Sequence, residues 1–211
     1  GLVPVRMLSG WGVGETRGRM AAPWIAVVLL ASMWATWTWL RLDAWRDPLT
    51  LWTDVLEKQP ESARVHGNLG KEYHIRGQLA EARHHLTRAA ALDPRDPKPL
   101  ANLARVEADG GDFLKARAIL QELERGGLRD HIIYSDLGWV HYRLGNLREA
   151  AHAYELALGY EPRLSNVNYR LAEIYARLGD RARAGAFARQ ELVLNPQHPE
   201  ARRLLTALGE N

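Results

Sequence analysis

Two kinds of hydrophobic pattern divide the chain. Residues 20–40 are apolar almost throughout and carry no charge, whereas after residue 47 apolar positions recur three and four residues apart between charged ones. A 3.6-residue period predicts amphipathic helices, and no segment shows the two-residue alternation of a half-buried strand. We therefore predict an all-α chain in which one long apolar helix precedes a series of amphipathic helices.

The apolar stretch is long enough to cross a bilayer. As a helix, its 21 residues extend ~31 Å at about 1.5 Å per residue, close to the thickness of the hydrocarbon core. Trp24 and Trp39 lie near its ends, as in interfacial aromatic belts. A signal peptide is disfavoured because 32–35 offer no small-residue cleavage site, and a buried soluble helix because a polar face is almost missing. We predict a transmembrane helix over 20–40.

Flanking charges predict the orientation of this helix. Residues 1–19 carry three arginines and residues 41–47 carry two, so the positive-inside rule makes 1–19 a cytoplasmic flank. The region 41–211 is then extracytoplasmic, and we expect a protein of the inner or plasma membrane. Because the chain begins with Gly1 rather than Met, we also expect it to be a fragment or a processed product.

A 34-residue repeat organises the rest of the chain. Leu69 recurs as leucine at four further steps of 34, and a small residue follows each of the first four of these leucines. Gly77 recurs as glycine at 111, 145 and 179, and Ala82 recurs as alanine at 116, 150 and 184. Prolines at 60, 94, 162 and 196 keep the same step, with Leu128 as the exception. Such self-similarity indicates stacked copies of one supersecondary unit.

Each repeated position has a structural reason. Small residues at the Gly70 position let two helices cross closely, and the alanine at the Ala82 position faces that crossing. Glycine at the Gly77 position ends the first helix in a left-handed conformation without a Cβ penalty. Proline at the Pro94 position stops the second helix before the next repeat. The predicted unit is therefore a helix, a tight turn, a second helix and a turn marked by proline.

The segments NLGKEYHIRGQLAEARHHLTRAAALDP and DLGWVHYRLGNLREAAHAYELALGYEP resemble tetratricopeptide (TPR) repeats in spacing and residue type. The four predicted repeats are 63–96, 97–130, 131–164 and 165–198. The second is the least regular, because Glu107 stands where other repeats have an aromatic residue and 126–128 replace the proline turn.

The predicted array has an additional element at each end. Residues 41–62 form a connecting and capping half-repeat, whose helix opens with Asp47 as N-cap and Pro48 at the first helical position. Residues 199–211 form a C-terminal capping helix. The TPR resemblance implies that the helix pairs stack into a right-handed superhelical solenoid with a concave inner surface.

The resemblance also implies where a ligand binds. In TPR proteins the first helix of each pair lines the groove, and stacked asparagines hold the backbone of an extended peptide. Asn68 and Asn102 match that use, whereas Asp136 and Arg170 depart from it. The predicted peptide-groove residues are Arg64, Asn68, Lys71, Lys98, Asn102, Arg105, Asp136, Trp139, Tyr142 and Tyr169.

The predicted groove is basic in its first half and aromatic in its second. Arginines and lysines surround the asparagines of repeats one and two, while Trp139, Tyr142 and Tyr169 belong to repeats three and four. This set suits an extended polypeptide with acidic or carbonyl-rich groups at one end and apolar groups at the other. The alternative is that these are ordinary solvated helix faces, which interleaved charges usually indicate.

Composition narrows the chemistry further. The chain has no cysteine, which excludes disulfides, thiol catalysis and Cys-ligated metals. Its net charge of +3 arises within residues 1–41, so the repeat region lacks the basic excess of a nucleic-acid binder. The eight histidines lack metal-ligand spacing, and no catalytic or phosphate-binding motif occurs. We predict no enzyme activity, cofactor, metal or nucleic-acid partner for this chain.

The join between the apolar helix and the repeats carries a second resemblance. The apolar stretch, WRDPLTLW over 45–52 and the NLG-type repeats look like the tail of polytopic TPR-containing O-mannosyltransferase-like glycosyltransferases. Three functions are therefore open. They are a membrane-tethered scaffold that binds an extended polypeptide, the non-catalytic acceptor-binding or regulatory tail of a larger membrane glycosyltransferase, and an envelope assembly factor. The scaffold, with a protein or peptide in its groove and the bilayer around 20–40, is our leading hypothesis.

Overall fold

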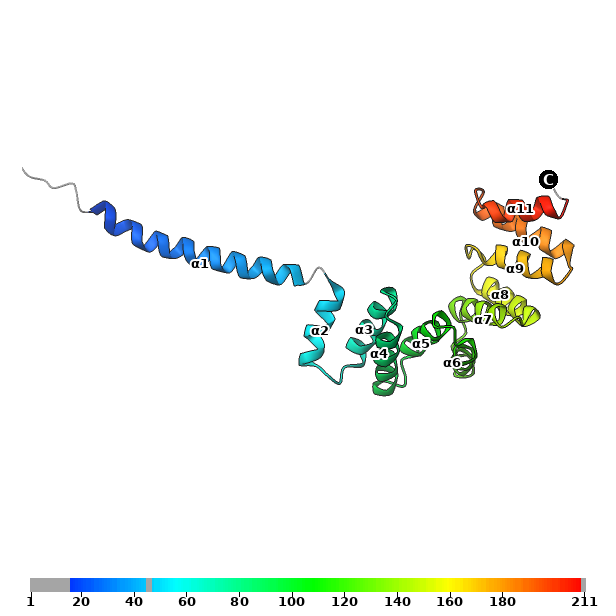
Figure 1. The fold of residues 1–211 in the computed structure, drawn as a ribbon, viewed down its shortest axis with the longest axis horizontal. Coiled ribbons are helices and arrows are strands. Elements are labelled where there is room, and N and C mark those ends of the chain that lie inside the picture. The colour runs from blue at the N-terminus through cyan, green and yellow to red at the C-terminus, as the bar shows by residue number, and fades with distance from the viewer. Residues whose placement is uncertain (1–15, 45–46, 210–211) are drawn as a thin grey trace, which may run out of the picture. The chain divides into compact units, whose positions relative to one another are not determined.

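A computed structural model describes the backbone of residues 16–44 and 47–209 and the side chains of 24–39 and 47–209. This described part contains eleven α-helices and no strand, so the predicted all-α class is confirmed (Figure 1). The chain divides into two compact units, Gly1–Leu51 and Trp52–Asn211, and each is considered by itself. Most of the predicted cytoplasmic flank, 1–19, lies outside the described residues.

The first unit is dominated by one long helix, α1 (Thr16–Ala44). All of its described side chains, 24–39, are exposed. Among the described residues no helix is both long enough and apolar enough to cross a membrane. The transmembrane helix predicted over 20–40 is therefore not supported. The residues of α1 whose side chains are described, 24–39, are fewer than the ~20 apolar residues that a crossing needs. The side chains at both ends of the predicted span lie outside the described residues.

Helix α2 (Pro48–Lys58) begins as the sequence predicted. The carboxylate of Asp47 accepts a hydrogen bond from the backbone N–H of Leu49 at 3.2 Å and another from the Thr50 hydroxyl at 2.9 Å. These bonds satisfy groups that a helix N-terminus otherwise leaves unpaired, and Pro48 needs no such partner. None of the side chains of α2 is buried.

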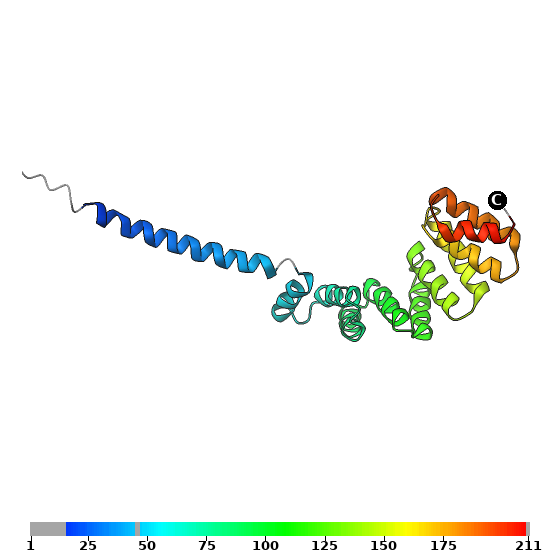
Figure 2. The ribbon, with the colours of Figure 1, turned by 45° about the horizontal axis from the view of Figure 1, so that its top comes forward.

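The second unit continues with four helix pairs and a final helix. The pairs are α3 (Ala63–Ile75) with α4 (Leu79–Leu92), α5 (Lys98–Asp109) with α6 (Phe113–Arg125), α7 (His131–Arg143) with α8 (Leu147–Tyr160), and α9 (Val167–Arg177) with α10 (Arg181–Leu194). Helix α11 (Pro199–Ala207) follows and packs against α9 and α10 (Figure 2). Each second helix also contacts the first helix of the next pair, and the buried residues form four hydrophobic clusters that follow one another along the array.

A left-handed glycine closes the turn inside every pair. Gly77, Gly111, Gly145 and Gly179 have φ values of 72°, 87°, 80° and 83°. After α3, the N–H of Gly77 donates to the carbonyl of His74 and that of Gln78 to the carbonyl of Tyr73, both at 2.9 Å. A Cβ would strain this conformation, which is why glycine recurs here with the 34-residue period.

The two helices of a pair cross most closely at the small residues that follow the repeated leucines. A Cβ built on Gly70 would lie 2.5 Å from Cγ of Leu86, and one built on Gly138 would lie 2.7 Å from the ring of Tyr154. Ala150 faces the same crossing and is fully buried. Close packing at these points fixes the geometry of each pair and thereby the direction of its exposed face.

Successive first helices also touch one another. Within the second unit α3 contacts α5, α5 contacts α7, and α9 contacts α11. A hydrogen bond between Tyr142 and Glu173 joins α7 to α9. Together these contacts place the exposed sides of α3, α5, α7 and α9 along one surface, which we call the first-helix face. All ten residues predicted to line the groove lie on these four helices or at their first residues.

Candidate peptide-binding surface

The first-helix face keeps every predicted groove residue within reach of solvent. None of the ten is buried, and Arg64, Lys71 and Lys98 are exposed. The other seven are partly exposed, because each lies over the contact between neighbouring helices. The structure therefore places the predicted residues on one surface, and their side-chain partners separate them into two groups.

Neighbouring first helices meet in a register of 31 residues. Arg105 Nε lies 2.8 Å from Asp136 Oδ2, and the Tyr142 hydroxyl lies 2.5 Å from Glu173 Oε1; both pairs are 31 residues apart. The guanidinium of Arg170 also lies 5.4 Å from the ring centre of Trp139, one repeat beyond the Arg105–Asp136 pair. The corresponding positions between α3 and α5 are Lys71 and Asn102.

The part of the face that belongs to repeats one and two is chemically open. Within residues 47–209, the side chains of Arg64, Asn68, Lys71, Lys98 and Asn102 have no hydrogen-bond or ion-pair partner. Two amides and three cations thus face solvent side by side. Because an amide offers a donor and an acceptor, this part of the face can pair with an extended backbone and with negative charge.

The part that belongs to repeats three and four is closed by its own side chains. Trp139 and Tyr142 stack with ring centres 6.0 Å apart. Arg143 and Arg170 lie 5.1 and 5.4 Å from the Trp139 ring centre, and Arg177 lies 5.2 Å from that of Tyr142. Such cation–π contacts and the Tyr142–Glu173 hydrogen bond use the groups that the sequence offered to a ligand.

Tyr169, the last predicted groove residue, is also engaged. Its ring centre lies 4.7 Å from that of His198, which is buried at the start of α11. His198 Nδ1 accepts a hydrogen bond from the Ala201 N–H at 3.3 Å, and Nε2 lies 3.2 Å from Asn166 Oδ1. Tyr169 therefore belongs to the packing between the fourth pair and the final helix.

A cavity of about 200 Å³ opens on the first-helix face between α5 and α7. Its wall is mainly apolar and comprises Ala104, Ala108, Leu120, Val140 and one side of Trp139. The Arg105–Asp136 ion pair borders it, together with a contact of 2.6 Å between His74 Nε2 and Asp109 Oδ2. Sequence reasoning missed His74 and Asp109, although their separation of 35 residues, one more than the repeat, was a usable signal.

The carboxylate of Asp136, at the border of this cavity, is poorly solvated. Burial raises the pKa of its carboxyl above the ordinary value, and the nearby guanidinium of Arg105 partly opposes that rise. The Arg105–Asp136 pair therefore neutralises a charge that the surroundings solvate poorly. The contact uses Nε of Arg105 and Oδ2 of Asp136, and the Arg105 side chain stays 40% exposed.

The histidines of the first pair serve packing. Nδ1 of buried His66 lies 2.9 Å from Nδ1 of His85, and His66 Nε2 lies 3.0 Å from the Pro60 carbonyl. His85 also stacks on Tyr73 with ring centres 5.3 Å apart. Burial, followed by the neighbouring His66 and His84, lowers the pKa of His85 to about 4. No group of three or more metal-ligating side chains occurs in the described part of the chain.

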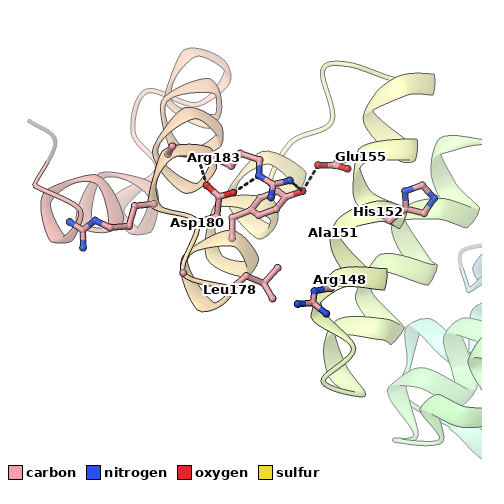
Figure 3. A pocket seen from close by; sticks show the side chains of 11 residues that line it. Arg148, Ala151, His152, Glu155, Leu178, Asp180 and Arg183 are labelled. Carbon is pink, nitrogen blue, oxygen red and sulfur yellow. Dashed lines mark hydrogen bonds and ion pairs between the residues drawn. The ribbon is translucent and has the colours of Figure 1, made fainter.

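A larger hollow of about 710 Å³ lies between α8 and the fourth pair (Figure 3). Arg183 Nε lies 2.6 Å from Asp180 Oδ2, and Arg183 Nη1 donates to the Tyr175 hydroxyl at 3.0 Å. That hydroxyl donates to Glu155. Burial, and then the bond to Glu155, raises the pKa of Tyr175 to about 12. These groups satisfy one another, so they connect α8 to the fourth pair.

The fold is an α-solenoid built from helix pairs, and family comparison identifies the class of repeat. Residues 41–97 and 135–207 match the tetratricopeptide repeat family, and residues 73–127 match a second description of the same repeat. The first match alone covers more than half of the chain. The chain therefore belongs to the tetratricopeptide repeat family, which confirms that part of the sequence-based recognition.

Solved TPR structures share the fold. PilF of Pseudomonas aeruginosa has a TM-score of 0.69 at 18% identity, with 81% of this chain and 79% of that chain covered. YrrB, a TPR protein with an unusual peptide-binding site, has a TM-score of 0.63 at 19% identity, with 75% and 81% covered. TTC0263, a thermophilic TPR protein of Thermus thermophilus, has a TM-score of 0.59 at 23% identity, with 76% and 88% covered. No curated protein matches in sequence.

Proposed function

We propose that the chain is a protein-interaction module that binds an extended polypeptide along the first-helix face of repeats one and two. The observation that supports this most is the pair Asn68 and Asn102. Both amides are partly exposed, and neither has a hydrogen-bond partner within residues 47–209. A peptide backbone presents alternating donors and acceptors, which are the groups that a primary amide pairs with.

Charge around these amides favours a polypeptide that carries negative groups. Arg64, Lys71 and Lys98 are exposed cations beside the asparagines, and no carboxylate in the described residues pairs with them. Complementary charge speeds encounter and fixes the register of a ligand. Membership of the TPR family is consistent with a non-catalytic binding role.

The test uses the full chain, immobilised and screened against a phage-displayed library of random twelve-residue peptides. Replacement of both amides, Asn68→Ala with Asn102→Ala, should weaken binding of the enriched peptides by ~1–3 kcal/mol, since each lost hydrogen bond is worth ~0.5–1.5 kcal/mol. Gln190→Ala removes an exposed amide from α10 and is the matched control. Equal binding by the double variant and the control would contradict the proposal.

We further propose that residues 20–40 attach the repeat array to a membrane. The support is the exposed apolar surface of α1, where Trp24, Leu29 and Trp34 are 69%, 65% and 71% exposed. No described side chain of 24–39 carries a charge. A contiguous apolar surface of this kind marks a membrane or protein contact, because water solvates it poorly.

Membrane attachment is tested by fractionation. The full chain should stay in the pellet after a carbonate wash, and deletion of residues 1–41 should release it to the supernatant. Recovery of the intact chain in the washed supernatant would rule out attachment. Protease accessibility of the repeats in sealed cells then tests the extracytoplasmic orientation expected from the flanking arginines. The glycosyltransferase-tail and assembly-factor alternatives both contain this array and stay predictions.

A further inference from the structure

We propose that the cavity between α5 and α7 receives one large apolar side chain of the bound polypeptide, while an acidic side chain of the same polypeptide lies over Lys71 and Asn102. This inference rests on the proposed function, since it assumes a polypeptide on the first-helix face. It specifies the ligand class as an extended segment with one acidic and one large apolar residue.

The size and wall of the cavity argue for a single apolar side chain. Its volume of about 200 Å³ is below the ~300–1,000 Å³ of pockets that bind drug-sized molecules. Ala104 and Ala108 leave room because they are small, and Leu120 and Val140 complete an apolar wall. The polar groups at the border already have partners in the described residues, Arg105 with Asp136 and His74 with Asp109, so the apolar wall is the part of the cavity without a polar partner.

The repeat register argues for the acidic residue. Lys71 and Asn102 occupy the positions that Arg105 and Asp136 occupy one repeat later. In the later repeat a carboxylate neutralises the cation at 2.8 Å, whereas in the earlier one an amide stands in the carboxylate's place. A carboxylate from a ligand would supply the missing charge, and Arg64 and Lys98 add to the same positive surface.

The aromatic part of the face is a poorer anchor for the apolar residue. Arg143 and Arg170 lie over Trp139, and Arg177 lies over Tyr142. A ligand side chain that stacked on these rings would have to displace these cations, of which Arg170 also holds Glu173 in place. The cavity instead offers an apolar wall whose alanine, leucine and valine side chains are at most 7% exposed, so a ligand group reaches this wall only by entering the cavity. The acidic residue therefore lies toward repeat one and the apolar residue toward repeat three.

The first arm of the test changes the peptide, so that protein folding does not enter. Acetylated and amidated twelve-residue peptides enriched from the random library are resynthesised with the apolar residue changed to alanine or the acidic residue changed to its amide. Each change should weaken binding to the full chain ~10-fold, the scale of a side-chain anchor. Unchanged affinity of the alanine peptides would overturn the cavity assignment and leave the proposed function standing.

The second arm changes the protein. Asn102→Asp supplies Lys71 with the carboxylate that Asp136 supplies to Arg105. It removes the Asn102 amide for every peptide, and should weaken acidic peptides ~10-fold more than their amide analogues. Ala108→Leu fills the cavity and should weaken the peptides that carry the apolar residue, and Ala118→Leu on the exposed side of α6 is its matched control. Equal loss for acidic and amide peptides would overturn the charge assignment. Failure of every library peptide to bind would overturn the proposed function itself.

Discussion

The first two repeats and the last two share a scaffold and differ on their exposed face. In both regions a left-handed glycine closes the turn, and a small residue marks the helix crossing. On the first-helix face, however, the amides and exposed cations of repeats one and two lack partners within residues 47–209, while the aromatic and charged groups of repeats three and four bind one another. The residues that pack the helices together recur in every repeat, whereas the residues that face solvent differ between repeats.

The 31-residue register shows how one geometry gives three different outcomes. The side chains of Lys71 and Asn102 form no hydrogen bond within residues 47–209. Arg105 and Asp136 form an ion pair of 2.8 Å, and Trp139 with Arg170 forms a cation–π contact of 5.4 Å. The second and third pairs show that helix packing can bring these two positions together, and residue type decides which contact forms. A side chain on the first-helix face is thus available to a ligand where its neighbour at the 31-residue offset is not complementary to it.

The largest expected effect tests the shared scaffold. Gly138→Ala should cost ~2–3 kcal/mol of unfolding free energy, because its Cβ would lie 2.7 Å from the Tyr154 ring and overpacking is costly. The Cβ of Gly70→Ala would lie 2.5 Å from Cγ of Leu86, but the cost should be only ~1 kcal/mol, because buried Ala104 and Leu120 occupy the equivalent positions in repeat two and show that a leucine can accommodate this alanine. Urea denaturation of the full chain measures both. A larger loss for Gly70→Ala would contradict the equivalence of the two crossings.

Gly159 provides the control for these two substitutions. It lies near the end of α8, its conformation is helical, and a Cβ there would meet no atom within 4 Å. Gly159→Ala should therefore stabilise the protein by ~0.5–1 kcal/mol, because alanine loses less conformational entropy in a helix than glycine. Destabilisation by this substitution would show that the losses at the crossings cannot be assigned to overpacking alone.

The next prediction is that low pH destabilises the first two repeats more than the last two. The folded pKa of His85 is about 4 against an ordinary 6.5, so between these values the unfolded chain binds a proton that the folded chain does not. Stability should therefore fall by ~2 kcal/mol as the pH drops from 6.5 to 4. The equivalent positions in repeats three and four are Ala153 and Phe187, which do not titrate. Hydrogen exchange should show faster opening of α4 than of α10 at low pH.

His85→Phe tests the cause of that opening, because it places the aromatic residue of repeat four at the same position. The variant should lose the extra exchange of α4 below pH 6.5 and keep the exchange of α10 unchanged. Persistence of the pH dependence in this variant would show that His85 is not its cause.

Much of the fold is predictable because its constraints recur every 34 residues. The sequence predicts helix ends at Gly77 and its equivalents, and the structure gives these glycines the expected positive φ. Face residues are also predictable, since exposure follows from helix phase. Their partners are not: the Tyr142–Glu173 and Arg105–Asp136 contacts depend on the offset between neighbouring first helices, which periodicity alone does not determine. Once known, that 31-residue offset predicts such pairs from sequence.

The smallest expected effect comes from giving the Arg105–Asp136 pair of positions the chemistry of the Lys71–Asn102 pair. Asp136→Asn gives Arg105 the amide neighbour that Lys71 already has, and should tighten binding of acidic peptides by ~0.5–1 kcal/mol. Because the folded pKa of Asp136 is raised, the folded state holds its proton longer than the unfolded state, so ionisation costs stability as the pH rises above 3.8. The amide removes that cost and the contact to Arg105 together, and the net change in stability at pH 7 should stay within ~1 kcal/mol.

Peptide titration at two salt concentrations measures the gain in affinity for acidic peptides, which should shrink at the higher salt because it is electrostatic. Weaker binding of acidic peptides by Asp136→Asn would show that Arg105 needs the Asp136 carboxylate to orient its guanidinium for a ligand. The Arg105–Asp136 and Lys71–Asn102 positions would then not be equivalent.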